Sequence, residues 1–421
     1  MFERLTATLL AVLLAAGGAL AQEKDAKKPD ATSATTAPEP PKPVRIGFST
    51  SKTGLFAPVS AAHRNAYLLW RDMVNARGGL EIAGGERRKV ELLERDDRSE
   101  PTAAAKIYHG FIYREKVDLV LSPQGEFRLR AVAPVVARAK YPLLATASTI
   151  VDAKAVGMPG VFLVTPFSPE AVARELAGLI TARGITRAAI LSNRLRFPAQ
   201  TAAATATLLE RAGVAIVHRA DYAPDIADLK PILAAAKGGA PEAVLVFSEP
   251  GDAILYLNQA PASGLNPKLQ FLLEGPARDI FRKLYGPALN GIVTLGNWNP
   301  ADENGAGSAA FLEGYRKTFG ADPDPVASVN AFVACQILEQ AVARVGLDRR
   351  KLREAIGGMS FDTLVGPVSF EGNRNGTTPA GLISIETGGS RQVWPVAGGA
   401  GAVAVPEMTG STGSTGNSAG E

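Results

Sequence analysis

Short apolar runs alternate with amphipathic helical patterns from residue 44 to residue 273, and this alternation constrains the fold more than any other feature. Strands are expected in two series, at 44–48, 90–93, 117–121, 143–145 and 161–164, and then at 188–191, 214–217, 243–247 and 269–273. Strand–helix–strand units of this kind form right-handed crossovers in a parallel sheet covered on both faces. The fold class is therefore α/β, with two Rossmann-like lobes built on parallel central sheets.

Length and composition are consistent with two compact lobes. The chain has 421 residues, 46% of them hydrophobic, which is enough to bury two cores. Its 45 basic and 41 acidic residues are scattered and leave a net charge of only +4. No basic stripe is present that could displace counterions from nucleic acid, so a nucleic-acid partner is not expected.

Cysteine and histidine usage gives no sign of metal or redox chemistry. The single cysteine, Cys335, lies in an apolar run and is interpreted as a core residue. His63, His109 and His218 stand far apart and form no zinc-type pair. We therefore expect neither a metal nor another cofactor.

The N-terminus has the pattern of a secretory signal peptide. Arg4 precedes the apolar run 5–16, and Ala19 to Ala21 supplies the small residues that signal peptidase accepts before Gln22. A signal peptide over 1–21 implies a periplasmic protein, and an uncleaved hydrophobic anchor is the alternative. No cysteine follows the run to carry a lipid anchor.

The two ends of the mature chain are expected to be disordered. Residues 22–43 combine Lys, Asp, Thr and Pro with few bulky apolar side chains, and 396–421 are rich in Gly, Ser and Thr. The folded unit is expected at 44–395.

Ligands of open parallel sheets bind beyond the carboxyl ends of the strands. This rule selects four loop regions, which are 49–58, 122–127, 146–152, and 247–251 together with 274–277. The adjacent acids Asp96 and Asp97 are interpreted as a turn and cap rather than a catalytic pair, and Ser99 as the N-cap of a helix that has Pro101 in its first turn and runs through Tyr113.

At these loops the chain resembles the Leu/Ile/Val-type periplasmic solute-binding proteins of ABC transporters, which have the type I periplasmic-binding fold. The resemblance runs from about Val44 to Pro395. It rests on the order and spacing of several motifs, namely IGFSTSKTGLFAP, W-x-x-x-V-N-A-x-G-G-L, DDRSEP, AVAPVVARAKYPLL, GPARDIF, GNWNP and LVGPVSFEGNRNG.

The resemblance implies two lobes joined by a hinge of three crossings, near Pro166, Leu295 and Gly366. Lobe I would comprise 44–165 with 296–365, and lobe II would comprise 166–295 with 366–395.

The resemblance also implies a ligand site on the first lobe. Gly125 and Glu126 occupy positions where the family has small hydroxyl residues at a helix N-terminus. The carboxylate of Glu126 would repel a ligand carboxylate unless it points away or pairs with Arg128 or Arg130. Ala147, Ser148 and Thr149 match the loop that presents backbone groups and a hydroxyl, although the two hydroxyls can also close a turn.

On the second lobe the resemblance implies ligand contacts at Phe197, Phe247 and Glu274. Glu274 matches the acid that receives the ammonium group in amino-acid binders, and a buried ammonium requires such a partner. Ordinary packing for the two phenylalanines, and a solvated loop position for Glu274, are the alternatives. Phe56 and Trp298 are expected to be structural.

The implied function is that of a substrate-binding protein of an ABC importer, a monomer that closes on an amino acid or a related amine or amide and docks on a permease. A ligand sensor feeding a signalling partner is the alternative. An α/β hydrolytic enzyme is remote, because the sequence has no G-x-S-x-G elbow between an expected strand and an expected helix, no P-loop and no G-x-G-x-x-G after the first strand.

Overall fold

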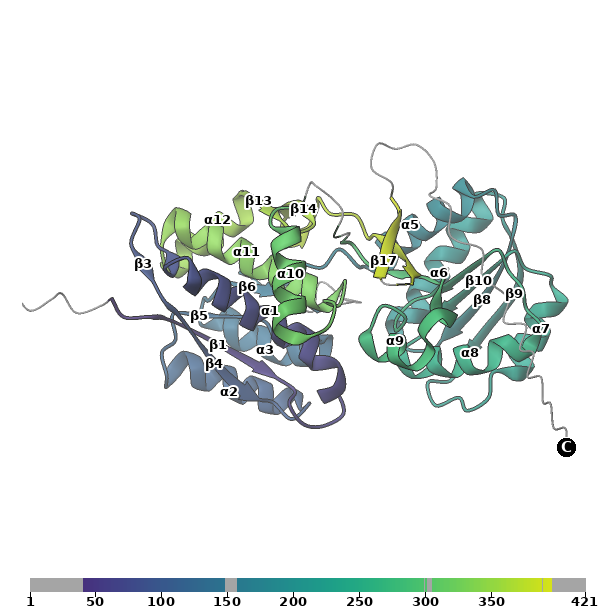
Figure 1. Ribbon diagram of the computed structural model, residues 1–421, viewed down its shortest axis with the longest axis horizontal. Coiled ribbons are helices and arrows are strands. Elements are labelled where there is room, and N and C mark those ends of the chain that lie inside the picture. The colour runs from purple at the N-terminus through teal and green to yellow at the C-terminus, as the bar shows by residue number, and fades with distance from the viewer. Residues whose placement is uncertain (1–40, 148–156, 299, 301–304, 388, 396–421) are drawn as a thin grey trace, which may run out of the picture. The chain divides into compact units, whose positions relative to one another are not determined.

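The computed structural model describes residues 41–147, 157–298, 300, 305–387 and 389–395. The expected alternation of strands and helices is present throughout (Figure 1). The first series consists of β1 (Val44–Thr50), α1 (Ala57–Ala76), β2 (Leu80–Glu81), β3 (Arg87–Arg88), β4 (Val90–Asp96), α2 (Pro101–Tyr113), β5 (Leu119–Val120), α3 (Glu126–Arg138), β6 (Leu143–Ala145) and β7 (Val161–Leu163).

The second series begins at α5. It consists of α5 (Pro169–Ala182), β8 (Arg187–Asn193), α6 (Arg196–Arg211), β9 (Ala215–Tyr222), α7 (Lys230–Gly238), β10 (Ala243–Phe247), α8 (Pro250–Ser263), β11 (Leu269–Leu272), α9 (Asp279–Tyr285), the 3-10 helix η1 (Gly286–Leu289) and β12 (Val293–Leu295).

The rest of the chain adds helices and short antiparallel strands. These are α10 (Ser308–Phe319), α11 (Ala327–Val345), α12 (Arg349–Gly358), β13 (Ser360–Thr363), β14 (Gly366–Glu371), β15 (Arg374–Asn375), β16 (Leu382–Glu386) and β17 (Gly389–Trp394).

The strands form separate sheets. In the first lobe, β4-β1-β5 is parallel, and β13-β14-β15-β7-β6 combines parallel and antiparallel pairs. The second lobe has the order β17-β16-β12-β11-β10-β8-β9, parallel from β9 to β12 and antiparallel at β16 and β17. The predicted α/β class is confirmed, and the antiparallel strands near the C-terminus are an addition to it.

The expected lobe boundary at residue 366 differs from the strand pairing. β14 pairs with β13 through a two-residue connection, and Arg374 of β15 lies opposite Leu163 of β7. Gly366 has a φ of 84°, a left-handed value that favours glycine and permits this tight turn. The chain therefore stays in the first lobe's sheet until Asn375 and enters the seven-stranded sheet only at β16.

Strand β10 shows how the second lobe is covered on both faces. Leu245 and Phe247 belong to one apolar cluster with α5 and α6, whereas Val244 and Val246 belong to the opposite cluster with α7 and α8. Successive side chains of a strand point to opposite faces, so an all-apolar strand is buried on both.

The first lobe is built in the same way. Helices α1, α10, α11 and α12 contribute to one apolar cluster, while α2 and α3 contribute to the other. Cys335 is fully buried on α11 in the first of these clusters, as predicted.

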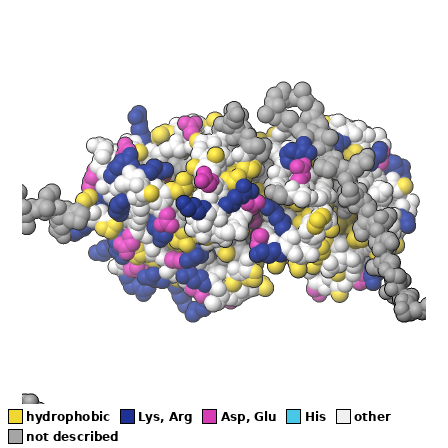
Figure 2. Space-filling model, in the orientation of Figure 1, with side chains coloured by type: hydrophobic (Ala, Val, Ile, Leu, Met, Phe, Trp, Pro, Cys, Tyr) yellow, Lys and Arg dark blue, Asp and Glu magenta, His cyan; other side chains and the backbone are white. Residues whose placement is uncertain are grey.

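No helix in the described ranges is both long enough and apolar enough to cross a membrane. On the face of the molecule in Figure 2, basic and acidic side chains are interspersed.

Candidate functional site

The loop between β1 and α1 is held by the two acids at the end of β4. Asp97 accepts hydrogen bonds from the hydroxyls of Ser49 and Ser51 at 2.8 and 2.6 Å. Asp96 accepts from the backbone N–H of Lys52 at 2.9 Å. The predicted turn is confirmed, because Asp97 also accepts from the Ser99 N–H at 3.0 Å, whereas neither acid caps α2, whose N-cap is Glu100.

The N-cap prediction for Ser99 is wrong. Glu100 is the N-cap of α2, and the Ser99 hydroxyl instead donates to the Thr53 carbonyl at 2.8 Å and accepts from the Phe56 N–H at 3.0 Å. A long-range contact thus replaced the local cap, and it fixes the loop that carries Leu55 and Phe56.

The loop between β5 and α3 carries Gly125 and Glu126. Gly125 has a φ of 82°, and a Cβ added there would lie 2.6 Å from a terminal nitrogen of Arg128. Glu126 is the first residue of α3, and its carboxylate lies 3.5 Å from the guanidinium of Arg130. Of the two arginines expected as partners of Glu126, the structure pairs it with Arg130.

Arg128 is buried, with 3% of its surface exposed. Its Nε donates to the carbonyl of Gln124 at 2.7 Å, and its guanidinium carbon lies 4.5 Å from the centroid of the Phe56 ring. Burial lowers the pKa of Arg128, and the charge of Asp97 opposes that shift.

The loop after β6 begins with Thr146 and Ala147. The hydroxyl of Thr146 lies 2.7 Å from Nε2 of His63. Burial and the charge of Arg128 lower the pKa of His63 to about 3, so its imidazole is neutral at physiological pH. Ala147 is fully buried, and Ser148 and Thr149 lie outside the described residues.

On the second lobe, Phe197 and Glu274 follow the ends of β8 and β11. Phe197 is in the first turn of α6 and is 5% exposed. Glu274 accepts a hydrogen bond from Arg278 at 2.8 Å, and both side chains are largely buried.

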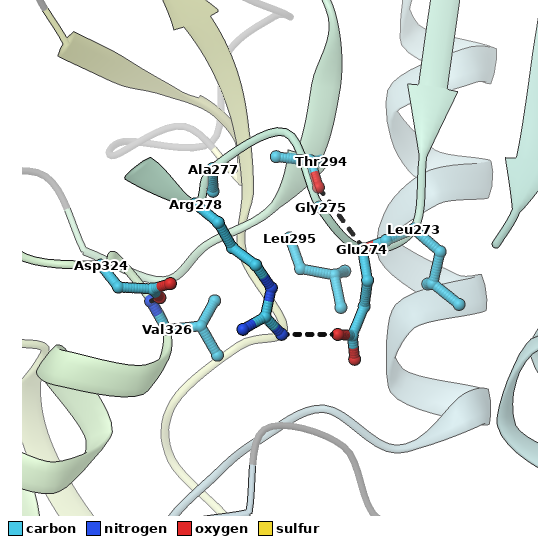
Figure 3. Close-up of a pocket in the computed structure, with 9 residues that line it drawn as sticks. All are labelled: Leu273, Glu274, Gly275, Ala277, Arg278, Thr294, Leu295, Asp324 and Val326. Atoms are coloured by element: carbon cyan, nitrogen blue, oxygen red, sulfur yellow. Dashed lines mark hydrogen bonds and ion pairs between the residues drawn. The ribbon is translucent and has the colours of Figure 1, made fainter. Parts of the chain in front are cut away.

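Arg278 also experiences the charge of Asp324, which is drawn with it in Figure 3 around a small cavity of about 30 Å³. Burial alone would lower the pKa of Arg278, but the charges of Glu274 and Asp324 outweigh burial and raise it. Arg278 therefore remains charged beside Glu274.

Glu249 precedes α8 and closes a capping box. Its side chain accepts from the N–H of Asp252, whose carboxylate accepts from the Glu249 N–H at 2.8 Å. Burial and the charges of Glu274 and Asp252 raise the pKa of Glu249 to about 8. Arg278 opposes this shift, and Glu126 adds to it.

One cavity of about 740 Å³ unites these loops. Four of the residues selected from the sequence line it, namely Gly125, Glu126, Phe197 and Glu274. Its volume falls within the range of roughly 300–1,000 Å³ that is typical of small-molecule sites.

The cavity is also lined by five charged residues that were not predicted to contact the ligand, namely Arg128, Arg130, Arg196, Glu249 and Arg278. Glu249 lies within a loop selected by the strand-end rule, and Arg278 stands four residues after Glu274 at the start of a helix. The selected loop could therefore have identified Glu249 from the sequence, and the four-residue spacing from Glu274 could have identified Arg278.

Phe247 and Trp298 pack in cores. Phe247 is fully buried, with its ring centroid 5.7 Å from that of Phe271. Trp298 donates from Nε1 to the Ser308 hydroxyl at 2.7 Å and packs on Phe311. Phe56, also expected to be structural, lines the cavity instead. In the described part of the chain, no three His, Cys, Asp or Glu side chains gather in a way that could hold a metal ion.

The cavity of this two-lobed α/β protein lies at the strand ends, where ligands of such folds bind. The family described as periplasmic binding protein matches residues 43–390, and the chain belongs to that family.

One curated relative is Leu/Ile/Val-binding protein homolog 7 of Brucella abortus (strain 2308), which is 22% identical over 167 residues. That match covers 37% of this chain and only 40% of the relative's length.

Solved structures share the fold at low sequence identity. The LivJ substrate-binding protein of Streptococcus pneumoniae in complex with isoleucine is 19% identical, with a TM-score of 0.70 over 84% of this chain and 100% of that one. A solute-binding protein of an ABC transporter from R. palustris, in complex with benzoate, is 21% identical, with a TM-score of 0.67 over 87% of this chain and 99% of that one.

Proposed function

We propose that this chain is the extracytoplasmic substrate-binding protein of an ABC importer and that it binds an amino acid or a related small amine or amide. The observation that carries the proposal is the cavity of about 740 Å³, whose charged residues follow the ends of β5, β8, β10 and β11. Export through cleavage of residues 1–21, function as a monomer and docking on an ABC permease belong to the same proposal.

The ligand would be held by charge-assisted hydrogen bonds in the cavity, from which closure of the two lobes would exclude water. Arg278 donates to Oε2 of Glu274, which leaves the other carboxylate oxygen for the ammonium group of a ligand. Each charge-assisted hydrogen bond contributes about 1.5–3 kcal/mol when water is excluded. The ligand would then select the closed state, and the permease would recognise that state.

The ligand class is tested by a thermal-shift screen of amino acids, amides, ureas, polyamines and benzoate. A true ligand raises the melting temperature in proportion to the logarithm of its concentration over the dissociation constant. We expect at least one amine-bearing solute to do so. A screen in which no such solute stabilises the protein would contradict the ligand class.

Replacing Glu274 tests the ammonium contact. We predict that Glu274→Ala weakens an amine-bearing ligand at least tenfold, about 1.4 kcal/mol, because the ammonium loses its carboxylate partner. Calorimetry gives the affinity. The matched control is Glu354→Ala, which removes a carboxylate from another Glu–Arg pair at helical spacing, an exposed one outside the cavity. Equal affinity of wild type and Glu274→Ala would remove Glu274 from the site.

Two simpler observations separate the alternatives. Recovery of the bound solute unchanged after incubation supports binding without catalysis. Neighbouring genes for a permease and an ATPase support import, whereas a histidine kinase gene supports the sensor.

A further inference from the structure

We propose that Arg128 binds the carboxylate of the ligand, so that the first lobe recognises an anionic group with a side-chain guanidinium. This inference rests on the proposed function and adds to it a residue and a ligand group. The ligand class it defines is a small carboxylate with an apolar body.

The first observation is that Arg128 is buried without a carboxylate partner in the described ranges. Arg130, on the same helix, pairs with Glu126 at 3.5 Å, and Arg278 pairs with Glu274 at 2.8 Å. Arg128 has no such ion pair, although it is 3% exposed. A buried charge without a counter-charge is costly, and a bound anion would remove that cost.

The surrounding acids do not supply the missing partner. The charge of Asp97 acts on Arg128 through space, but no ion pair within 4.0 Å and no hydrogen bond joins the two described side chains, and the oxygens of Asp97 are directed to Ser49 and Ser51. Glu126 is directed to Arg130. The counter-ion of Arg128 is thus left to come from the cavity.

The second observation is the way Arg128 is held. Its Nε donates to the Gln124 carbonyl, and its guanidinium lies over the ring of Phe56, so the side chain is fixed from two sides. The terminal nitrogens remain as donors, and one of them occupies the space beside Gly125 that any Cβ there would fill. A planar guanidinium with its terminal nitrogens available matches the two oxygens of a carboxylate.

The third observation is the apolar lining of the same cavity. Among the described residues, three of the six most exposed large apolar side chains line it, and these are Leu55 (82% exposed), Phe127 (69%) and Leu195 (43%). Apolar surface of this kind gains free energy when a ligand or closure covers it. A carboxylate attached to an apolar body satisfies both the guanidinium and this lining.

The test uses benzoate and its neutral analogue benzamide on the full-length protein. The side-chain Nε–H resonance of Arg128 is assigned in the NMR spectrum by its loss in Arg128→Lys and is followed during each titration. We expect benzoate to shift this resonance saturably and benzamide to leave it in place. An Arg128 resonance unmoved by benzoate, or moved equally by both compounds, overturns the proposal.

Variants provide the second readout. We expect Arg128→Gln to weaken benzoate binding at least tenfold in calorimetry, while Arg138→Gln, which removes an exposed arginine of the same helix outside the cavity, changes it less than twofold. Equal losses in the two variants would mean that only overall charge matters, and the proposal would be wrong. If Arg128→Gln does not fold, the wild-type titration still decides.

The outcome is separable from that of the proposed function. If a solute stabilises the protein in the thermal screen while benzoate does not shift the Nε–H resonance of Arg128, the binding function stands and Arg128 is excluded from the site. If Arg128 responds to benzoate while no amine-bearing solute stabilises the protein, the anion site stands and the amine ligand class falls.

Discussion

The pairing and the pKa of each ionisable residue at the cavity depend on the residues that lie near it in space. Glu274 is paired with Arg278, Glu126 with Arg130, and Glu249 is surrounded by other acids. Glu274 and Glu126 were predicted because the resemblance to the family places both at ligand-contact positions, in loops that follow strand ends. It did not reveal the state of Glu249, because burial and the charges of residues far away in sequence determine its pKa.

The raised pKa of Glu249 leads to a pH-dependent stability. Its folded pKa of about 8 exceeds the ordinary value of 4.5, so the native protein retains a proton that the unfolded chain loses. The stabilisation is complete below about pH 4.5 and is lost as the pH rises to about 8. We expect the wild type to lose about 1 kcal/mol or more, relative to Glu249→Gln, between about pH 6 and about pH 9.

Urea unfolding at the two pH values measures this difference. Glutamine is the appropriate replacement because its amide oxygen can still accept the capping hydrogen bond from Asp252. The exposed Glu354→Gln serves as the control and is expected to track the wild type. A wild-type minus Glu249→Gln difference that does not vary with pH would contradict the assignment.

Elements were predicted best where the apolar pattern is continuous. The bounds of β6 and β10 match the sequence prediction, and α2 ends at Tyr113 as expected, because the apolar side chains of these segments show in the sequence itself which residues are buried. The antiparallel strands β13 to β17 were not predicted. Their pairing depends on a tight turn at Gly366 and on partners elsewhere in the chain.

The two-sided burial of β10 predicts a large cost for Leu245→Ala. The side chain is fully buried between the sheet and the helices packed on it, so its truncation leaves a cavity. We expect a loss of about 2–5 kcal/mol in the free energy of unfolding.

The matched control is Leu284→Ala on α9, where the leucine is 58% exposed. Its truncation is expected to change stability by about 0.5 kcal/mol or less. Similar losses for the two variants in denaturant unfolding would contradict the account of the core.

At the scale of the whole molecule, two sets of apolar clusters separate along the chain. Elements of the first lobe supply one set, and elements of the seven-stranded sheet supply the other. The alternation of strands and helices predicted the two lobes. The last crossing of the chain into the second lobe was predicted near Gly366 but comes about ten residues later. Strand pairing, which the local sequence does not reveal, keeps 366–375 in the first lobe's sheet.

The central claim is that a solute bound in the cavity of about 740 Å³ draws the two lobes together. Small-angle X-ray scattering of the full-length protein, with and without a saturating solute from the thermal screen, tests it directly. We expect a smaller radius of gyration in the bound state, and an unchanged radius of gyration at saturation would show that ligand binding does not close the lobes.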